Sequence, residues 1–170
     1  TGGAAVLHAD EITYAVAGPL GVEGLGRRVL EIHEGIAACL QGALQFLGVA
    51  ARRGGDGRPA GFACFGAAGG HEITVDGRKL VGSALRRTRG AFLQHGSLLV
   101  GAGHEALPRY VADRDPAGDE RAVADLRRRT VTLAELGHAD LQPRAFAAAL
   151  AERLAVRLGG EAEAIEAAAR

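Results

Sequence analysis

Residues 72–84 read Glu72-Ile-Thr-Val-Asp-Gly-Arg-Lys-Leu-Val-Gly-Ser-Ala84. Asp76-Gly77 between two apolar runs is a strong signal for a β-hairpin with a two-residue turn. Such a turn pairs Val75 with Arg78, Thr74 with Lys79 and Ile73 with Leu80. Because side chains alternate between the faces of a strand, this register predicts one face that carries Glu72, Thr74, Lys79, Val81 and Ser83.

The hairpin extends into a larger predicted sheet. Thr88-Arg-Gly90 marks a second turn, so the segment from Glu72 to Val100 predicts a three-stranded antiparallel meander. Upstream, the alternation of Ile12-Thr-Tyr-Ala-Val16 predicts a half-buried strand that ends at Gly18-Pro19. A shorter strand is expected at Ala5 to Leu7.

Helices are predicted both before and after the segment of strands at residues 72–100. Residues 27–47 carry apolar side chains at three- and four-residue steps, which is typical of a helix with one buried face. Cys39 lies next to this stripe and is expected to be a small core residue. The stripe residues are Val29, Ile32, Ile36, Leu40, Leu44 and Leu47.

Further helices are expected in the last third of the chain. Residues 120–129 predict a short helix, after a loop bracketed by Pro108 and Pro116. Thr132-Leu-Ala-Glu135 has the spacing of a capping box. A longer helix should begin at Pro143 and end at Gly159, with an apolar stripe of Phe146, Leu150, Leu154 and Leu158. The chain therefore predicts an α+β fold, a mixed or antiparallel sheet packed by helices.

The bulk composition limits the class of protein. A chain of 170 residues suits a single domain, residues 1–170, with 48% hydrophobic residues for its core. The net charge is zero and the densest basic run, Arg127–Arg129, has no interleaved aromatic, so no nucleic-acid partner is predicted. No apolar stretch reaches the ~18 residues of a membrane span. Two cysteines, Cys39 and Cys64, cannot form a disulfide framework, which indicates a reducing, cytoplasmic setting.

The chain contains no methionine, even at position 1, and opens on Thr1-Gly2-Gly3. Since translation normally starts with methionine, we expect a fragment or a processed product. The expected loss is an N-terminal segment of the same domain.

Lys79 is the only lysine among the 20 basic residues. A compact ammonium can approach a single developing oxyanion, whereas a guanidinium is a planar fork that stays charged. A functional lysine beside the Gly82-Ser83 turn is one interpretation. The other is a structural cross-strand pair with Glu72.

Three further pieces could carry chemistry. Gly2-Gly3 would let backbone N–H groups approach a ligand, although such a turn is often only a turn. Cys64 precedes a glycine-rich loop and is either a nucleophile or an inert buried thiol. His95 in the third strand is either catalytic or a structural hydrogen-bonding residue. No zinc-protease, Walker A or serine-hydrolase motif occurs and the histidines lack ligand spacing, so no metal site is predicted.

Together these pieces resemble the lipoate–protein ligase and octanoyltransferase family. The segment from Thr1 to Tyr14 resembles its glycine-rich ligand motif, residues 76–84 its lysine motif, and residues 93–97 the strand that follows. Ala63-Cys64-Phe65 is similar to the cysteine segment of the M-type octanoyltransferases. The resemblance implies the fold of the biotin and lipoate protein ligase catalytic domains.

The resemblance also implies an activity and a set of site residues. Cys64 would be the nucleophile that carries an octanoyl thioester, and Lys79 would stabilise the oxyanion. The donor would be acyl carrier protein and the acceptor a lysine of a lipoyl domain or of the glycine-cleavage H protein, with no cofactor. The residues implied to bind substrate are Gly2, Gly3, Val6, His8, Gly82, Ser83 and His95.

Two alternatives remain at this point. An ATP-dependent lipoate–protein ligase would use ATP and Mg²⁺ to form an acyl adenylate, with Lys79 at the adenylate and Cys64 incidental. A catalytically silent acyl- or biotinyl-binding module would bind an acylated carrier without turnover.

Overall fold

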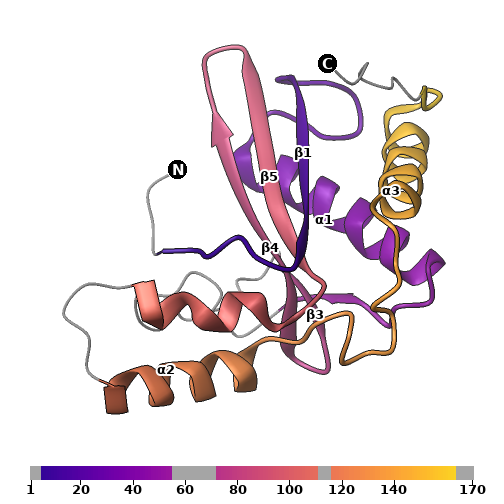
Figure 1. Ribbon diagram of the computed structural model, residues 1–170. Coiled ribbons are helices and arrows are strands. Elements are labelled where there is room, and N and C mark those ends of the chain that lie inside the picture. The colour runs from indigo at the N-terminus through magenta and orange to yellow at the C-terminus, as the bar shows by residue number, and fades with distance from the viewer. Residues whose placement is uncertain (1–4, 55–71, 111–115, 164–170) are drawn as a thin grey trace, which may run out of the picture.

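The computed structural model describes residues 5–54, 72–110 and 116–163. Its centre is a five-stranded antiparallel sheet in the order β1-β5-β4-β3-β2 (Figure 1). The strands are β1 (Glu11–Pro19), β2 (Arg52–Arg53), β3 (Ile73–Val75), β4 (Arg78–Arg87) and β5 (Ala91–Leu99). The helices are α1 (Val29–Phe46), the 3₁₀ helix η2 (Ala102–Tyr110), α2 (Pro116–Arg129) and α3 (Pro143–Leu158). The predicted α+β class and the meander are confirmed.

Helices α1 and α3 pack against each other and against one face of the sheet, which we call the inner face. The start of α1 is fixed by Glu31, whose carboxylate accepts hydrogen bonds from the backbone N–H groups of Arg27 and Arg28 at 3.0 and 2.9 Å. The predicted stripe is confirmed in its centre, where four residues are fully buried: Ile32, Ile36, Leu40 and Leu44.

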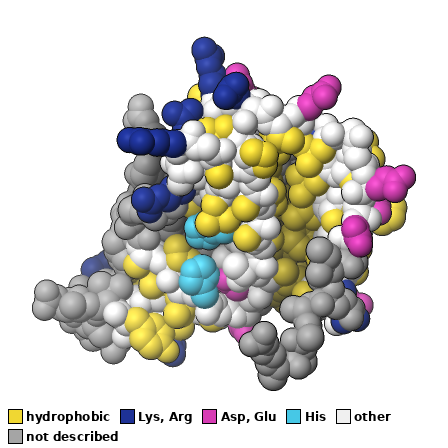
Figure 2. Space-filling view, turned by 90° about the horizontal axis from the view of Figure 1, so that it is seen from above, with side chains coloured by type: hydrophobic (Ala, Val, Ile, Leu, Met, Phe, Trp, Pro, Cys, Tyr) yellow, Lys and Arg dark blue, Asp and Glu magenta, His cyan; other side chains and the backbone are white. Residues whose placement is uncertain are grey.

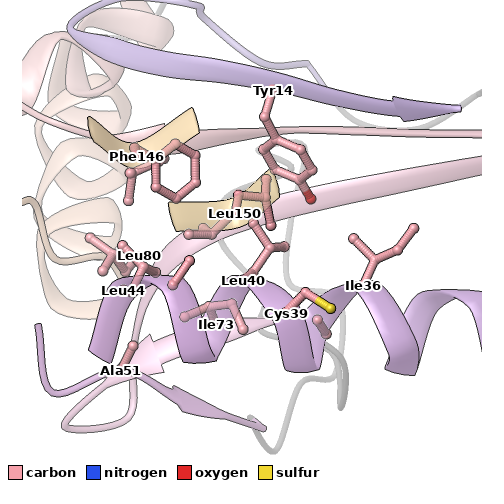
Figure 3. Close-up of a cluster of buried hydrophobic side chains, with 14 of the residues drawn as sticks. Tyr14, Ile36, Cys39, Leu40, Leu44, Ala51, Ile73, Leu80, Phe146 and Leu150 are labelled. Carbon is pink, nitrogen blue, oxygen red and sulfur yellow. The ribbon is translucent and has the colours of Figure 1, made fainter. Parts of the chain in front are cut away.

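Helix α3 begins and ends where the sequence predicts. Pro143 occupies its first turn, and Gly159 closes it with a left-handed φ of 68°. Phe146 and Leu150 are buried against α1 and the sheet, and Figure 3 shows their side chains among those of the core. Cys39 also lies in this core, as expected.

The opposite face of the sheet, the outer face, is covered at one end by η2 and α2 (Figure 1). Leu126 of α2 packs there on Leu99 of β5, and Val6 adds to this small cluster. Residues 102–110 form η2, which overlaps only the start of the loop predicted between Pro108 and Pro116, and residues 111–115 lie outside the described residues. Helix α2 begins at Pro116 and not at Glu120. Pro108 lies inside η2 and is buried.

Three local predictions need correction. Residues 5–7 form no strand, and β1 continues through Gly18 to Pro19. Proline is compatible with a strand at an edge, and β1 lies at the edge of the described sheet. Arg52 and Arg53 pair with β3 although a loop was predicted from Arg53 onward.

The capping-box spacing of residues 132–135 is realised in its hydrogen bonds. Thr132 N–H donates to the Glu135 carboxylate at 3.1 Å, and Glu135 N–H donates to the Thr132 hydroxyl at 3.2 Å. The segment closes as a turn at Gly137 instead of continuing as a helix. In the described part of the chain, no helix has the length and apolar character required to cross a bilayer.

Candidate functional site on the outer face

Six of the nine predicted site residues lie in the described part of the chain: Val6, His8, Lys79, Gly82, Ser83 and His95. Gly2, Gly3 and the predicted nucleophile Cys64 lie outside the described residues. The site is therefore built here from the strands that the six residues share.

Lys79 is held at the junction of β3, β4 and the segment after α2. Lys79 is 2% exposed, and its ammonium forms an ion pair with Glu72. Its backbone carbonyl accepts a hydrogen bond of 3.0 Å from Val131 N–H, next to a parallel bridge with Thr130. The predicted structural pair with Glu72 is thus present, and it fixes the ammonium in a buried position.

A β-bulge decides which face Lys79 occupies. Thr74 pairs with Lys79 as predicted, but Ile73 pairs with Val81 and not with Leu80. Consecutive residues of β3 point to opposite faces, so Lys79 and Val81 also lie on opposite faces. The prediction that Lys79, Val81 and Ser83 share a face is therefore wrong, because Leu80 is an extra residue in the strand.

Ser83 belongs to the inner face. Its hydroxyl lies 2.6 Å from the Tyr14 hydroxyl, which also accepts a hydrogen bond of 3.1 Å from Gln94 Nε2. Burial raises the pKa of Tyr14, and the hydrogen bonds from Ser83 and Gln94 oppose this effect. Gly96 provides the space, since a Cβ at this position would lie 2.6 Å from Tyr14 Cε1. The Ser83 side chain therefore links β4 to β1 on the inner face and does not point to the face that carries Lys79.

The outer face gathers the other predicted residues. Gly82 pairs with Ser97 of β5, which pairs in turn with Thr13 of β1. One step along the sheet on the same face, His95 lies half-buried between two alanines, Ala15 and Ala84. Lys79, Gly82 and His95 thus share a face, and Val6 packs at its covered end.

A polar cluster on this face was not predicted as a unit. The Glu11 carboxylate oxygen Oε1 accepts hydrogen bonds from Ser97 Oγ at 2.7 Å and from His8 Nδ1 at 2.6 Å. Asp10 makes this possible, because its left-handed φ of 51° turns the chain and brings His8 back over Glu11. The sequence signal was the short spacing between His8 and Glu11, but Ser97 is 86 residues from Glu11 and no local pattern connects them.

The described residues bring an ammonium, a carboxylate and imidazole rings to the outer face. Among them, no group of three or more His, Cys, Asp or Glu side chains is placed to hold a metal ion. A separate apolar groove of about 440 Å³ runs between the edge strand β1 and α3, lined in part by Tyr14, Phe146 and Leu150. Figure 2 shows a hollow lined by hydrophobic side chains and, to one side of it, histidine side chains at the surface.

Residues 1–155 match the profile of the lipoyl protein ligase A/B catalytic domain. The chain is 38% identical to octanoyltransferase LipM of Kyrpidia tusciae over an alignment of 179 residues, gaps included. The alignment covers 96% of this chain and 62% of that protein. It is 43% identical over 105 residues to octanoyltransferase LipM of Moorella thermoacetica, covering 59% of this chain and 38% of that protein. The chain thus spans less than two thirds of the length of these relatives.

Solved structures with the same fold are more distant in sequence. The bi-partite lipoate protein ligase of Thermoplasma acidophilum superposes with a TM-score of 0.62 at 15% identity, over 91% of this chain and 53% of that one. A lipoate-protein ligase A bound with ATP superposes with a TM-score of 0.59 at 16% identity, over 91% of this chain and 55% of that one. The sheet and its helices match these structures, and the match to the catalytic-domain profile covers nearly the whole chain. This chain belongs to the lipoyl protein ligase A/B catalytic-domain family.

Proposed function

We propose that the protein is an octanoyl (or lipoyl) transferase that acylates lysines of lipoyl domains or of the glycine-cleavage H protein. The observation that carries the proposal is the 38% identity to an octanoyltransferase LipM across 96% of this chain. Acyl carrier protein is the proposed donor, and the cytosol the proposed compartment. A lipoyl domain as acceptor is supported by the T. acidophilum ligase, which has an E2 lipoyl domain as its partner.

The proposed reaction has two acyl transfers. The Cys64 thiolate attacks the carbonyl of the donor thioester and the bond from carbon to the carrier sulfur breaks. The carrier sulfur leaves as a thiolate and takes up the proton that the Cys64 thiol had released. The acceptor amine then attacks the Cys64 thioester, an amide forms, and the Cys64 sulfur leaves. The first step exchanges one thioester for another and the second yields a more stable amide, so neither step requires ATP.

Lys79 is the proposed electrostatic partner in both steps. An ammonium favours a thiolate and stabilises a tetrahedral oxyanion, two tasks that need the same positive charge. Burial strengthens this interaction because less water screens it. The ion pair with Glu72 holds the ammonium at one place on the outer face, next to Gly82, whose backbone we propose to border the acyl pocket together with Gly2, Gly3 and Ser83.

The test is to mix the whole protein with octanoyl-acyl carrier protein, without ATP or acceptor, and to map any adduct by peptide mass spectrometry. An octanoyl group on Cys64 that is lost in Cys64→Ser is the expected result, and Cys39→Ser is the matched control that should still be loaded. If a lipoyl domain is modified only when ATP and free acid are supplied, the protein is a ligase. If an acylated carrier binds without any transfer, it is a binding module.

A further inference from the structure

The Glu11 carboxylate is the centre of a preorganised cluster on the outer face. Three donors converge on its Oε1 atom: His8 Nδ1 at 2.6 Å, Ser97 Oγ at 2.7 Å and Thr13 Oγ1 at 3.1 Å. The Glu11 side chain is only 5% exposed. Its second oxygen, Oε2, is buried, and none of the described residues hydrogen-bonds it. One carboxylate oxygen therefore holds three side chains of the outer face at a single point.

These contacts fix the state of the His8 ring. Because Nδ1–H donates to the carboxylate, the neutral ring carries its lone pair on Nε2 and can accept a proton there. The side chain is 59% exposed, and no described residue hydrogen-bonds Nε2. His104 provides a contrast, because it is buried and its Nε2 lies 3.0 Å from Thr130 Oγ1. His8 thus has one ring nitrogen oriented by a carboxylate, and its other ring nitrogen has no hydrogen bond to a described residue.

The cluster lies close to the proposed acyl site. Ser97, which also approaches His8 Nδ1 at 3.3 Å, pairs with Gly82, three residues from Lys79 in β4. Glu11 pairs with Leu99 in the next row of the same face. An exposed nitrogen at this position is accessible to a lysine carried on another protein, which a buried base would not be.

An acceptor lysine needs such a base. Its amine has a pKa of about 10.4 and arrives protonated near neutral pH, so it cannot attack a carbonyl until a proton leaves. We propose that His8 is the general base of the amide-forming step and that Glu11 and Ser97 are its positioning residues. This inference rests on the proposed function and assigns a role that Lys79, as a cation, cannot fill.

The proposed step balances without a further reactant. Nε2 of His8 takes one proton from the acceptor ammonium, and the freed amine then attacks the acyl carbon. The bond from carbon to sulfur breaks and the electron pair leaves on sulfur. The leaving sulfur takes the second proton of the attacking nitrogen, so Cys64 leaves as a thiol, and the imidazolium of His8 releases its proton to water.

The simplest structural alternative is an ion pair that only fastens the turn at Asp10. The two roles differ in their dependence on the nucleophile. Hydroxylamine is already unprotonated near neutral pH and needs no base, so it reacts with a thioester whether or not His8 is present. A base defect slows lysine attack alone, whereas a distorted site changes both reactions.

The experiment uses the whole protein loaded with octanoyl from octanoyl-acyl carrier protein and follows one turnover with a lipoyl domain or with hydroxylamine. For His8→Gln we expect the rate of transfer to the lipoyl domain, divided by the rate of hydroxylamine release from the same loaded protein, to fall by about 100-fold or more. Glu11→Gln should show the same selective defect to a smaller extent, since the ring loses its orienting charge. The matched control is His138→Gln, a histidine beside Gly48 at the end of α1, which should behave as wild type.

Two results overturn the proposal. Wild-type transfer to the lipoyl domain by His8→Gln removes His8 as the base, and equal slowing with both nucleophiles shows a structural role. Failure of the wild-type protein to acquire an octanoyl group is a different result, because it overturns the proposed function and this inference with it.

Discussion

Lys79 shows how burial makes a single side chain sensitive to geometry. The ammonium is enclosed against Glu72, so an arginine would keep the charge but place a larger planar group in the same space. For Lys79→Arg we expect transfer to fall by about 100-fold or more, the cost of losing one oxyanion donor, while the fold survives. Octanoyl transfer rates and far-UV circular dichroism of the same preparation check this. Near-native turnover in the folded variant would remove Lys79 from the mechanism.

Cys39 is the internal comparison for the proposed nucleophile. It is buried in the core, its thiol lies 3.5 Å from the carbonyl oxygen of Arg153, and burial raises its pKa while Arg157 and Arg153 oppose that effect. A protonated, buried thiol reacts slowly. We expect iodoacetamide at neutral pH to leave Cys39 unmodified in the native protein and to label it after unfolding. Mass spectrometry of tryptic peptides measures this, and rapid native labelling of Cys39 would contradict its burial.

At the level of single elements, β4 shows both the reach and the limit of the sequence. Asp76-Gly77 correctly predicted the hairpin and the pairing of Thr74 with Lys79. The bulge at Leu80 was missed because strict alternation was assumed, although two neighbouring apolar residues, Leu80 and Val81, are both fully buried. A one-residue insertion reverses every later side chain. The pattern could name the site residues, but only the pairing with β3 assigned them to faces.

Strand β5 depends on a glycine where it crosses Tyr14. A Cβ on Gly96 would meet the Gly82 carbonyl oxygen as well as the Tyr14 ring, so Gly96→Ala must displace backbone or ring. We expect a loss of about 1–3 kcal/mol in the free energy of unfolding, typical of overpacking, and a changed near-UV tyrosine signal. Urea denaturation measures it. The matched control is Gly90→Ala in the same hairpin, where nothing lies within 4 Å of the added carbon. Equal stability of the two variants would contradict the close approach.

His104 links η2 to the end of α2 and makes that link depend on pH. Thr130 Oγ1 donates to the Leu126 carbonyl at 2.7 Å, so it accepts from His104 Nε2–H. Burial lowers the pKa of His104, against raising effects of Gly101, Glu105, Glu135 and Glu11. The unfolded chain therefore binds a proton more readily than the folded one, and stability is lost as pH falls below about 6.5.

Replacing His104 tests this sign. In His104→Gln the free energy of unfolding should decline less between neutral pH and mildly acidic pH than it does in the wild type. Urea denaturation across that range gives both curves, and the other five histidines are common to both proteins. Parallel curves would show that His104 does not contribute to the acid sensitivity.

Across the whole molecule, predictions held where the determinants were local and failed where distant segments meet. The stripes of α1 and α3 follow from periodicity, and the structure confirms burial for the centre of the α1 stripe and for Phe146 and Leu150 of α3, whereas Val29 is 41% exposed. The cluster of Glu11 with Ser97 joins strands far apart in the chain, and η2 covers residues for which no helix was predicted. Neither feature has a periodic signature, because the first depends on sheet register and the second on packing beside α2.

The chain is expected to unfold as one cooperative domain, because a single core joins α1, α3 and the sheet. Phe146 is 1% exposed in that core. Its replacement by alanine should lower the free energy of unfolding by about 3–5 kcal/mol. Far-UV circular dichroism reports the helices, and tyrosine fluorescence reports Tyr14, buried in the sheet, together with the exposed Tyr110, so the change in fluorescence on unfolding is expected to come from Tyr14. The two denaturation curves should coincide in the wild type and in Phe146→Ala. Val156→Ala on the same helix, at a residue 75% exposed, is the control and should change stability by less than about 0.5 kcal/mol. If the helical signal were lost at a lower denaturant concentration than the tyrosine signal, α3 would be a separately folding unit, and the single-domain prediction would be wrong.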